Sequence, residues 1–225
     1  MINIVLLGAP GAGKGTQASL IVGEFGVKHV STGEIFRQEM KSGTELGHKI
    51  KSVMDSGALV SDDIVLEVIE EYIKNNRSSV KGFLFDGFPR TVPQAEGLEK
   101  IFNKFSLRLN AVIYIDVPDS EVVRRLSSRR ACPRCGRIYN IVTGPFPKED
   151  LLCDVCKVKL ETRSDDTEEV IKERLDVYRR QTSPLVSFYS DKKMLSRIDG
   201  RGKIEEIFLN IKKVVSQSTG KSKEN

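Results

Sequence analysis

Short apolar runs alternate with amphipathic segments along most of the chain. Runs of consecutive apolar residues, typical of strands buried on both faces, predict strands at residues 2–7, 28–31, 82–86, 111–117 and 195–198. Helical spacing predicts helices at residues 14–25, 32–41, 45–56, 62–75, 119–130, 167–188 and 203–215, with one more beginning after Thr91. This alternation indicates an α/β fold, a parallel five-stranded sheet with helices on both faces.

Two segments interrupt the alternation and are predicted to be inserts in one core domain. Residues 31–60 contain two helices with no strand between them, the first ended by Gly43, and residues 130–164 are rich in turns and contain every cysteine. Right-handed crossovers bring the carboxyl ends of all strands to one edge of the sheet, so both inserts leave and rejoin the core there. The polar residues 216–225 are expected to form a disordered tail. The core is then residues 1–30, 61–129 and 165–215.

A glycine-rich turn, GAPGAGKGT at residues 8–16, lies between the first strand and the first helix. Unpaired N–H groups and the positive end of the helix dipole make such a turn a phosphate site. Lys14 adds a charge for the outer phosphates, and a hydroxyl such as Thr16 can hold magnesium. The pattern is G-x-x-x-x-G-K, except that Gly15 replaces the usual serine or threonine. A plain turn is the alternative, but strand, glycines, lysine and helix all occur in the required order.

Arginines are concentrated near the same predicted edge. A planar guanidinium can hold two phosphate oxygens at once, whereas a single surface arginine is usually only a solvated charge. Several arginines at motif positions therefore favour a site for phosphate groups, although Arg125 has a structural role as an alternative. The candidates are Arg37, Arg90, Arg125, Arg129, Arg163 and Arg174.

Asp86 ends a buried strand and is a candidate for orienting the water ligands of magnesium. Asp116, at the end of another strand, is a competing candidate, and an aspartate that only caps the following loop is a further alternative. We prefer Asp86 because Gly-Phe-Pro-Arg follows it directly at residues 87–90.

The four cysteines form two C-x-x-C pairs separated by 17 residues: Cys132, Cys135, Cys153 and Cys156. This spacing is typical of a closed structural zinc site, in which four thiolates complete a tetrahedron. A small insert has too few apolar residues to be stabilised by burial alone, and a bound metal supplies the missing stability. Two disulfides are the main alternative and are disfavoured in a cytoplasmic chain.

Composition excludes some classes of protein. Hydrophobic residues are 39% and charged residues 30%, which is ordinary for a globular protein. The sequence has neither an apolar run of about 18–20 residues nor a signal-peptide pattern, so we expect a cytoplasmic protein without membrane contact. The net charge of +5 and a pI near 9.0 favour anionic partners.

Four motifs together resemble the adenylate kinases: the turn at residues 8–16, Ser-Thr-Gly at 31–33, Asp-Gly-Phe-Pro-Arg-Thr at 86–91, and Arg163-x-Asp-Asp166 followed by Arg174. The likeness covers essentially residues 1–215. It implies a P-loop NTPase type core, a helical NMP-binding insert and a zinc-bearing lid. It also implies magnesium-dependent, reversible phosphoryl transfer from ATP to AMP, giving two ADP, by a monomer that does not bind nucleic acid.

The resemblance also implies a role for individual residues. Catalytic residues would be Lys14, Asp86, Arg90, Arg125, Arg129, Arg163 and Arg174. ATP would contact Gly11, Ala12, Gly13, Lys14, Gly15, Thr16, Arg125, Arg129, Ile138, Tyr139 and Gly202. AMP would contact Thr32, Arg37, Ala58, Leu59, Val60, Gly87, Phe88, Pro89, Arg90, Gln94, Arg163 and Arg174.

Two of these roles are open. The family often has lysine at Gly202, so only a backbone contact is implied there. Gln94 can pair with an edge of adenine, but it is also the capping-box partner of Thr91, and we favour the base.

Three other functions compete with this interpretation. Another monophosphate kinase, for UMP, CMP or GMP, would use the same scaffold, although Thr32, Gln94 and the long insert favour AMP. A zinc-ribbon NTPase that binds nucleic acid would fit the pI, but the ribbon has only Tyr139 and Phe146 as aromatics. A regulatory GTPase would need an Asn-Lys-x-Asp motif, whereas Asn103-Lys104 is followed by Phe-Ser.

Overall fold

The structure is a computed structural model that describes residues 1–41 and 44–220. Its centre is a sheet of five parallel strands in the order β2-β3-β1-β4-β7. The strands are β1 (Ile4–Leu7), β2 (Lys28–Ser31), β3 (Phe83–Asp86), β4 (Ala111–Asp116) and β7 (Leu195–Asp199). The predicted parallel five-stranded sheet is therefore confirmed.

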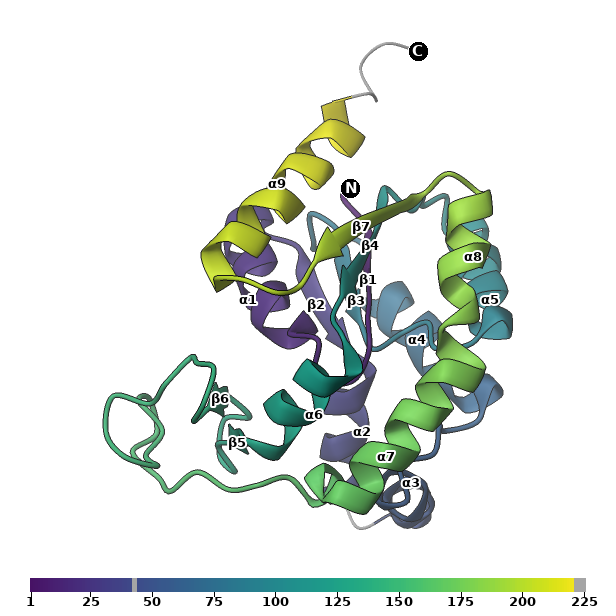
Figure 1. Cartoon of the computed structure of the whole chain (residues 1–225). Helices are drawn as coiled ribbons and strands as arrows, with labels where there is room; N and C mark the ends of the chain where they lie inside the picture. The colour runs from purple at the N-terminus through teal and green to yellow at the C-terminus, as the bar shows by residue number, and fades with distance from the viewer. Residues whose placement is uncertain (42–43, 221–225) are drawn as a thin grey trace.

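Helices cover both faces of this sheet (Figure 1). Ile4 and Leu6 of β1 face one apolar cluster, while Val5 and Leu7 face the other, as the two-residue repeat of a strand requires. The first cluster contains residues of α1 (Lys14–Phe25), α6 (Asp119–Ser127), α7 (Glu168–Val177) and α9 (Ile204–Gly220). The second contains residues of α4 (Asp62–Asn76), α5 (Val92–Lys104) and α8 (Pro184–Asp191).

Strand register sets which residues meet at the carboxyl edge of the sheet. Asp86 of β3 lies beside Leu6 of β1 on one side and beside Ser31 of β2 on the other. The loops that follow β1, β2 and β3 therefore open at the same place, and both inserts lie at this edge.

The first insert consists of α2 (Thr32–Lys41) and α3 (Glu45–Asp55). The Thr44 hydroxyl caps α3 by accepting a hydrogen bond from the Gly47 amide at 3.0 Å. Gly43, the predicted end of the first helix, lies outside the described residues.

The second insert holds a two-stranded antiparallel sheet, β5 (Arg129–Ala131) with β6 (Ile138–Asn140), and extends away from the core (Figure 1). The prediction that one helix runs over residues 119–130 was wrong in its last part, because α6 ends at Ser127 and Arg129 lies in β5. The Ser128 hydroxyl donates to the Arg124 carbonyl at 2.6 Å and contacts Asn140 Oδ1 at 3.0 Å. These contacts end the helix and start the strand pair.

Two other predicted elements differ from the structure. The predicted helix 167–188 is divided into α7, a π-helical turn η2 (Tyr178–Thr182) and α8. Pro184 explains the division, because its ring has no N–H group and crowds the preceding turn. The prediction of a disordered tail from residue 216 was wrong as far as Gly220, since α9 continues through that residue. Residues 221–225 lie outside the described part.

No helix within residues 1–41 and 44–220 has the length and apolar character needed to cross a membrane.

Candidate functional site

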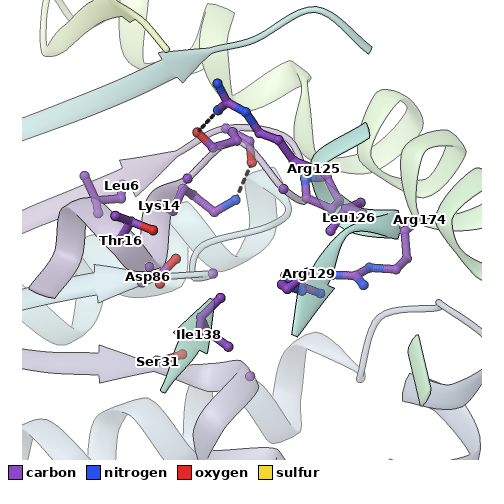
Figure 2. Close-up of a pocket in the computed structure, with 18 of the residues that line it drawn as sticks. Leu6, Lys14, Thr16, Ser31, Asp86, Arg125, Leu126, Arg129, Ile138 and Arg174 are labelled. Atoms are coloured by element: carbon purple, nitrogen blue, oxygen red, sulfur yellow. Dashed lines mark hydrogen bonds between the residues drawn. The ribbon is translucent and has the colours of Figure 1, made fainter. Parts of the chain in front are cut away.

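A cavity of about 370 Å³ opens at the carboxyl edge of the sheet. Its walls come from the glycine-rich turn, α2, the loop after β3, α6, β6 and α7, so segments far apart in the sequence meet there. Figure 2 shows Lys14, Asp86, Arg125, Arg129 and Arg174 gathered around it. The structure therefore brings together most of the residues that the sequence predicted for a phosphate site.

The turn holds its lysine close to its own backbone. Lys14 Nζ donates to the Gly8 carbonyl at 2.8 Å, drawn as a dashed line in Figure 2, and to the Ala9 carbonyl at 2.9 Å. Burial lowers the pKa of Lys14 to about 8, although the charge of Asp86 acts in the opposite direction. Gly13 has a φ of 95°, a conformation that glycine adopts without strain. A phosphate in this turn would give the ammonium a partner of opposite charge.

Asp86 lies in the cavity wall, close to the start of α1. A Cβ added to Gly15 would lie 3.7 Å from Asp86 Oδ2, so the carboxylate faces the turn. The competing Asp116 accepts a hydrogen bond from Tyr114 at 3.1 Å and lies 3.3 Å from Arg197, outside the cavity lining.

No sequence motif includes His29, yet His29 Nε2 lies 3.6 Å from Asp86 Oδ2. Burial opposes protonation of His29, but the neighbouring Asp86 carboxylate raises its pKa overall. Burial raises the pKa of Asp86, but His29 and Lys14 lower it by more, so the pKa lies below its usual value. Only the alignment of β2 with β3 could have revealed this contact. It places His29 beside Leu84, two residues before Asp86 on the same strand.

Four arginines crowd the cavity with positive charge. Burial lowers the pKa of each, and in every case the charge of another arginine in the site lowers it further. The Asp165 carboxylate acts in the opposite direction on all four arginines and offsets part of this repulsion, and a bound anion would offset more of it. The arrangement therefore fits a ligand with several negative charges. These arginines are Arg37, Arg90, Arg163 and Arg174, and all four line the cavity.

Two aspartates of the Arg163-x-Asp-Asp motif hold arginines in place, a role that the sequence did not assign. Asp166, whose side chain is fully buried, accepts from Arg129 Nε at 2.7 Å and from Arg174 Nη1 at 3.1 Å. Arg174 Nη1 also donates to the Asp165 carbonyl at 2.8 Å. Arg129 and Arg174 are thus fixed relative to each other.

Arg125 joins three segments around the cavity. It donates to Glu121 Oε1 at 2.9 Å, to the Gly200 carbonyl at 2.9 Å and to the Ala12 carbonyl at 3.4 Å. The structural role that the sequence left open for Arg125 is thus present, and its guanidinium also lines the cavity.

A second, smaller cavity of about 30 Å³ lies between the first insert and the loop after β3. Gln94 closes it: its Nε2 donates to Asp62 Oδ1 at 2.7 Å, and its Oε1 accepts from the Arg90 amide at 2.7 Å. Thr91 caps α5 by accepting from the Gln94 amide at 3.2 Å. The lining includes the predicted residues Thr32, Ala58, Leu59, Val60, Gly87, Arg90 and Gln94.

Phe88 is the exception among the residues predicted to contact AMP. Its side chain is fully buried in the second apolar cluster, with its ring centroid 6.0 Å from that of Phe85. It lines neither cavity. An aromatic residue between two motif residues faces the core here because Gly87 and Pro89 turn the backbone around it.

The four cysteines meet in the second insert. Their sulfur atoms all lie within 4.8 Å of one another, and all four cysteines are free, so the disulfide alternative is wrong. Four thiols around one point, two of them buried, match the donor set of a closed tetrahedral metal site.

Comparisons with known proteins agree with this geometry. The family model for adenylate kinase matches residues 6–194. The chain is 48% identical over 216 residues to an adenylate kinase of Methanothrix thermoacetophila, covering 96% of this chain and 99% of that protein. It is 47% identical over 214 residues to an adenylate kinase of Kosmotoga olearia, covering 93% and 99%. The chain therefore belongs to the adenylate kinase family.

Proposed function

We propose that this cavity catalyses reversible phosphoryl transfer between ATP and AMP, giving two ADP. The observation that carries the proposal is the crowding of four half-buried arginines and Lys14 around one cavity at the glycine-rich turn. Phosphoryl transfer is catalysed mainly by positioning the substrates and by placing positive charge around the migrating group. That demand matches what these side chains supply.

ATP is assigned to the side formed by the glycine-rich turn, α6 and β6. Lys14 and Arg129 would hold its phosphates, and the backbone from Gly11 to Thr16 would donate to them. Arg125, Ile138, Tyr139 and Gly202 would surround its base and ribose, and all four line the large cavity.

AMP is assigned to the side formed by the first insert and the loop after β3. Arg37, Arg90, Arg163 and Arg174 would hold its phosphate. The smaller cavity closed by Gln94 has room for about one water, so it would have to widen to receive the adenine. The free faces of the Gln94 amide can still pair with a base, because each of its polar atoms has one protein partner and can make two hydrogen bonds.

The reaction needs no general base. The second pKa of a phosphate monoester is about 6, so AMP is already an anionic nucleophile at neutral pH. Water is the competing acceptor, and closure of the two inserts over the substrates would exclude it. Guanidinium groups from both inserts would then complete the site only when both nucleotides are present.

Magnesium fits beside the turn. The Asp86 carboxylate faces the start of α1, where the Thr16 hydroxyl also lines the cavity. When bound with ATP, magnesium neutralises charge on the phosphates. Asp86 would orient its water ligands, and His29, 3.6 Å from the carboxylate, would add a neighbouring positive charge when protonated.

Zinc is the metal that we propose for the four cysteines. Four thiolates would fill all four positions of a tetrahedral ion and leave none for a catalytic ligand, as in structural zinc sites. Clustered free thiols of this kind also support the cytoplasmic location that the sequence predicts. The zinc would stabilise the second insert and take no part in the chemistry.

A coupled assay of ADP formation tests the function. ATP is offered with AMP, UMP, CMP or GMP in turn, and we expect turnover with AMP to exceed that with any other acceptor by at least about tenfold. A preference for another monophosphate would replace AMP with that acceptor. Binding of neither ATP nor any monophosphate to the folded chain, measured by calorimetry, would refute the proposal.

A further inference from the structure

Strand β6 lies between the cysteine cluster and the nucleotide cavity. Its residue Tyr139 is 2% exposed and contacts the cluster. Tyr139 Oη donates to Cys153 Sγ at 3.6 Å and accepts from the Asp154 amide at 2.9 Å. A hydroxyl that donates to a metal-binding sulfur orients that ligand, as outer partners do in many metal sites. Tyr139 is therefore an outer partner of the cysteine site.

The next residue, Asn140, is fixed to the opposite side. Its Nδ2 donates to the Arg125 carbonyl at 2.8 Å, and its Oδ1 accepts from Ser128 Oγ at 3.0 Å and from the Val142 amide at 2.9 Å. Asn140 thus holds β6 against the end of α6.

The end of α6 reaches the phosphate-binding turn through Arg125, whose Nη1 lies 3.4 Å from the Ala12 carbonyl and whose Nη2 donates to Gly200. Tyr139 and Asn140 themselves line the cavity. A continuous path of named contacts therefore runs from Cys153 to the turn, through two adjacent residues of one short strand.

We propose that Tyr139 and Asn140 are positioning residues that link metal loading of the four cysteines to binding of the triphosphate nucleotide. The inference rests on the proposed nucleotide site. With metal present, Cys153 is a fixed acceptor, so Tyr139 holds β6 in the position that lines the cavity. Without metal, the sulfurs lose their common centre, and β6 loses its anchor at that end. Metal and nucleotide then favour the same arrangement, and each must strengthen binding of the other.

Calorimetry on the full chain measures the link. ATP affinity, in excess magnesium, is compared between zinc-loaded protein and protein stripped by a chelator. We expect zinc-loaded protein to bind ATP at least about fivefold more tightly, the lower end of measured coupling between sites. In Tyr139→Phe, which keeps the ring and removes the hydroxyl, this ratio should fall toward one.

Zinc affinity, from competition with a chromophoric chelator in the absence of nucleotide, is an independent measurement. Tyr139→Phe should weaken zinc binding by about tenfold, the usual effect of losing an outer partner. Tyr189→Phe is the matched control, because Tyr189 is buried and its hydroxyl has no hydrogen-bond partner among the described residues. It should change neither the zinc affinity nor the ratio of ATP affinities between zinc-loaded and stripped protein.

Asn140→Asp tests the other end of the path. It keeps the Oδ1 acceptor but replaces the donor to the Arg125 carbonyl with a charged oxygen that this carbonyl repels. Because the change lies away from the cysteines, zinc affinity should stay within about twofold of the parent, while the ratio of ATP affinities between loaded and stripped protein falls. Equal ATP affinity of the loaded and stripped parent, or an unchanged ratio in both variants, would overturn the link. Failure of the parent to bind ATP in either state would instead refute the proposed function.

Discussion

Arg129 and Asp166 form a two-point ion pair, with Nε and Nη2 of the guanidinium donating to the two carboxylate oxygens. Arg129 begins β5, where the chain enters the second insert, and Asp166 lies in the short helix η1 (Ser164–Asp166), where the chain returns. The pair therefore joins the two ends of the insert, and Arg174 of α7 contacts the same carboxylate. One buried carboxylate thus fixes two arginines of the proposed phosphate site.

Asp166→Asn should therefore lower both activity and stability. The amide keeps one acceptor oxygen and loses the negative charge, so it cannot hold Arg129 at two points and Arg174 as well. Both arginines lose their fixed positions, and we expect kcat to fall by about tenfold to a hundredfold. Breaking a buried pair leaves uncompensated charge, so the free energy of unfolding should fall by about 3 kcal/mol. Steady-state kinetics and chemical denaturation measure the two effects.

The control for this variant is Asp176→Asn, on the same helix as Arg174. Asp176 pairs with Arg179 at 2.8 Å, but both side chains are more than half exposed, so little should change. An Asp166→Asn enzyme with parental kinetics would show that these arginines need no fixed position.

Lys14→Ala should reduce kcat by several orders of magnitude and leave the fold intact. The ammonium is a preorganised charge beside the phosphate-binding turn, and losing such a charge removes stabilisation of the transition state. Lys28→Ala, at an exposed position of β2, is the control. Circular dichroism checks the fold of both variants, and normal turnover by Lys14→Ala would contradict the assignment of the turn.

ATP affinity should fall as the pH rises above about 8. The pKa of Lys14 is about 8 in the free protein, so above that pH an increasing fraction of the protein has lost the ammonium that favours phosphate binding. The loss should approach about tenfold per pH unit, while ATP itself is already fully ionised. Calorimetry between pH 7 and 9 tests this, and the Lys14→Ala variant should show a flat profile over the same range.

Asp62→Ala should weaken recognition of AMP alone. Asp62 accepts from Gln94 Nε2 at 2.7 Å and from the Thr91 hydroxyl at 3.0 Å, so its removal frees the amide that closes the smaller cavity. We expect KM for AMP to rise by about tenfold and KM for ATP to stay unchanged. Asp63→Ala removes the neighbouring, exposed carboxylate of the same helix turn and should leave both KM values unchanged. A parallel rise in both KM values for Asp62→Ala would show a general disturbance of the core.

Protein purified without added metal should contain about one zinc per chain, measured by elemental analysis. Stripping the zinc should lower the temperature at which the second insert unfolds, because that insert has only a small apolar cluster of its own. Protein with full stability, reduced thiols and no bound metal would contradict this assignment. Hydrogen exchange of residues 132–160 locates the effect.

The turn at residues 8–16 could be predicted from sequence because its signals are local. A strand, a glycine-rich turn and a helix follow one another, and each is determined by neighbouring residues. The cysteine cluster was predictable for a similar reason, since the spacing within each pair fixes a tight turn around a metal.

Contacts between distant segments could not be predicted in this way. The His29–Asp86 contact depends on which residues of β2 and β3 lie side by side, and Arg129 belongs to β5 only because β6 pairs with it. The role of Asp166 depends equally on the return of the chain from the insert. Neither hydrophobic periodicity nor motif spacing contains that information.

The crowding of positive charge in the cavity also has a consequence for the stability of the protein in a cell. The groups concerned are Arg37, Arg90, Arg163 and Arg174. Repulsion among these groups, which Asp165 offsets only in part, opposes folding of the empty protein, and a nucleotide bound in the proposed site would relieve it. The melting temperature should therefore follow the concentration of adenine nucleotides. In a cell depleted of nucleotides, this protein would lie closer to unfolding and would be more open to proteases.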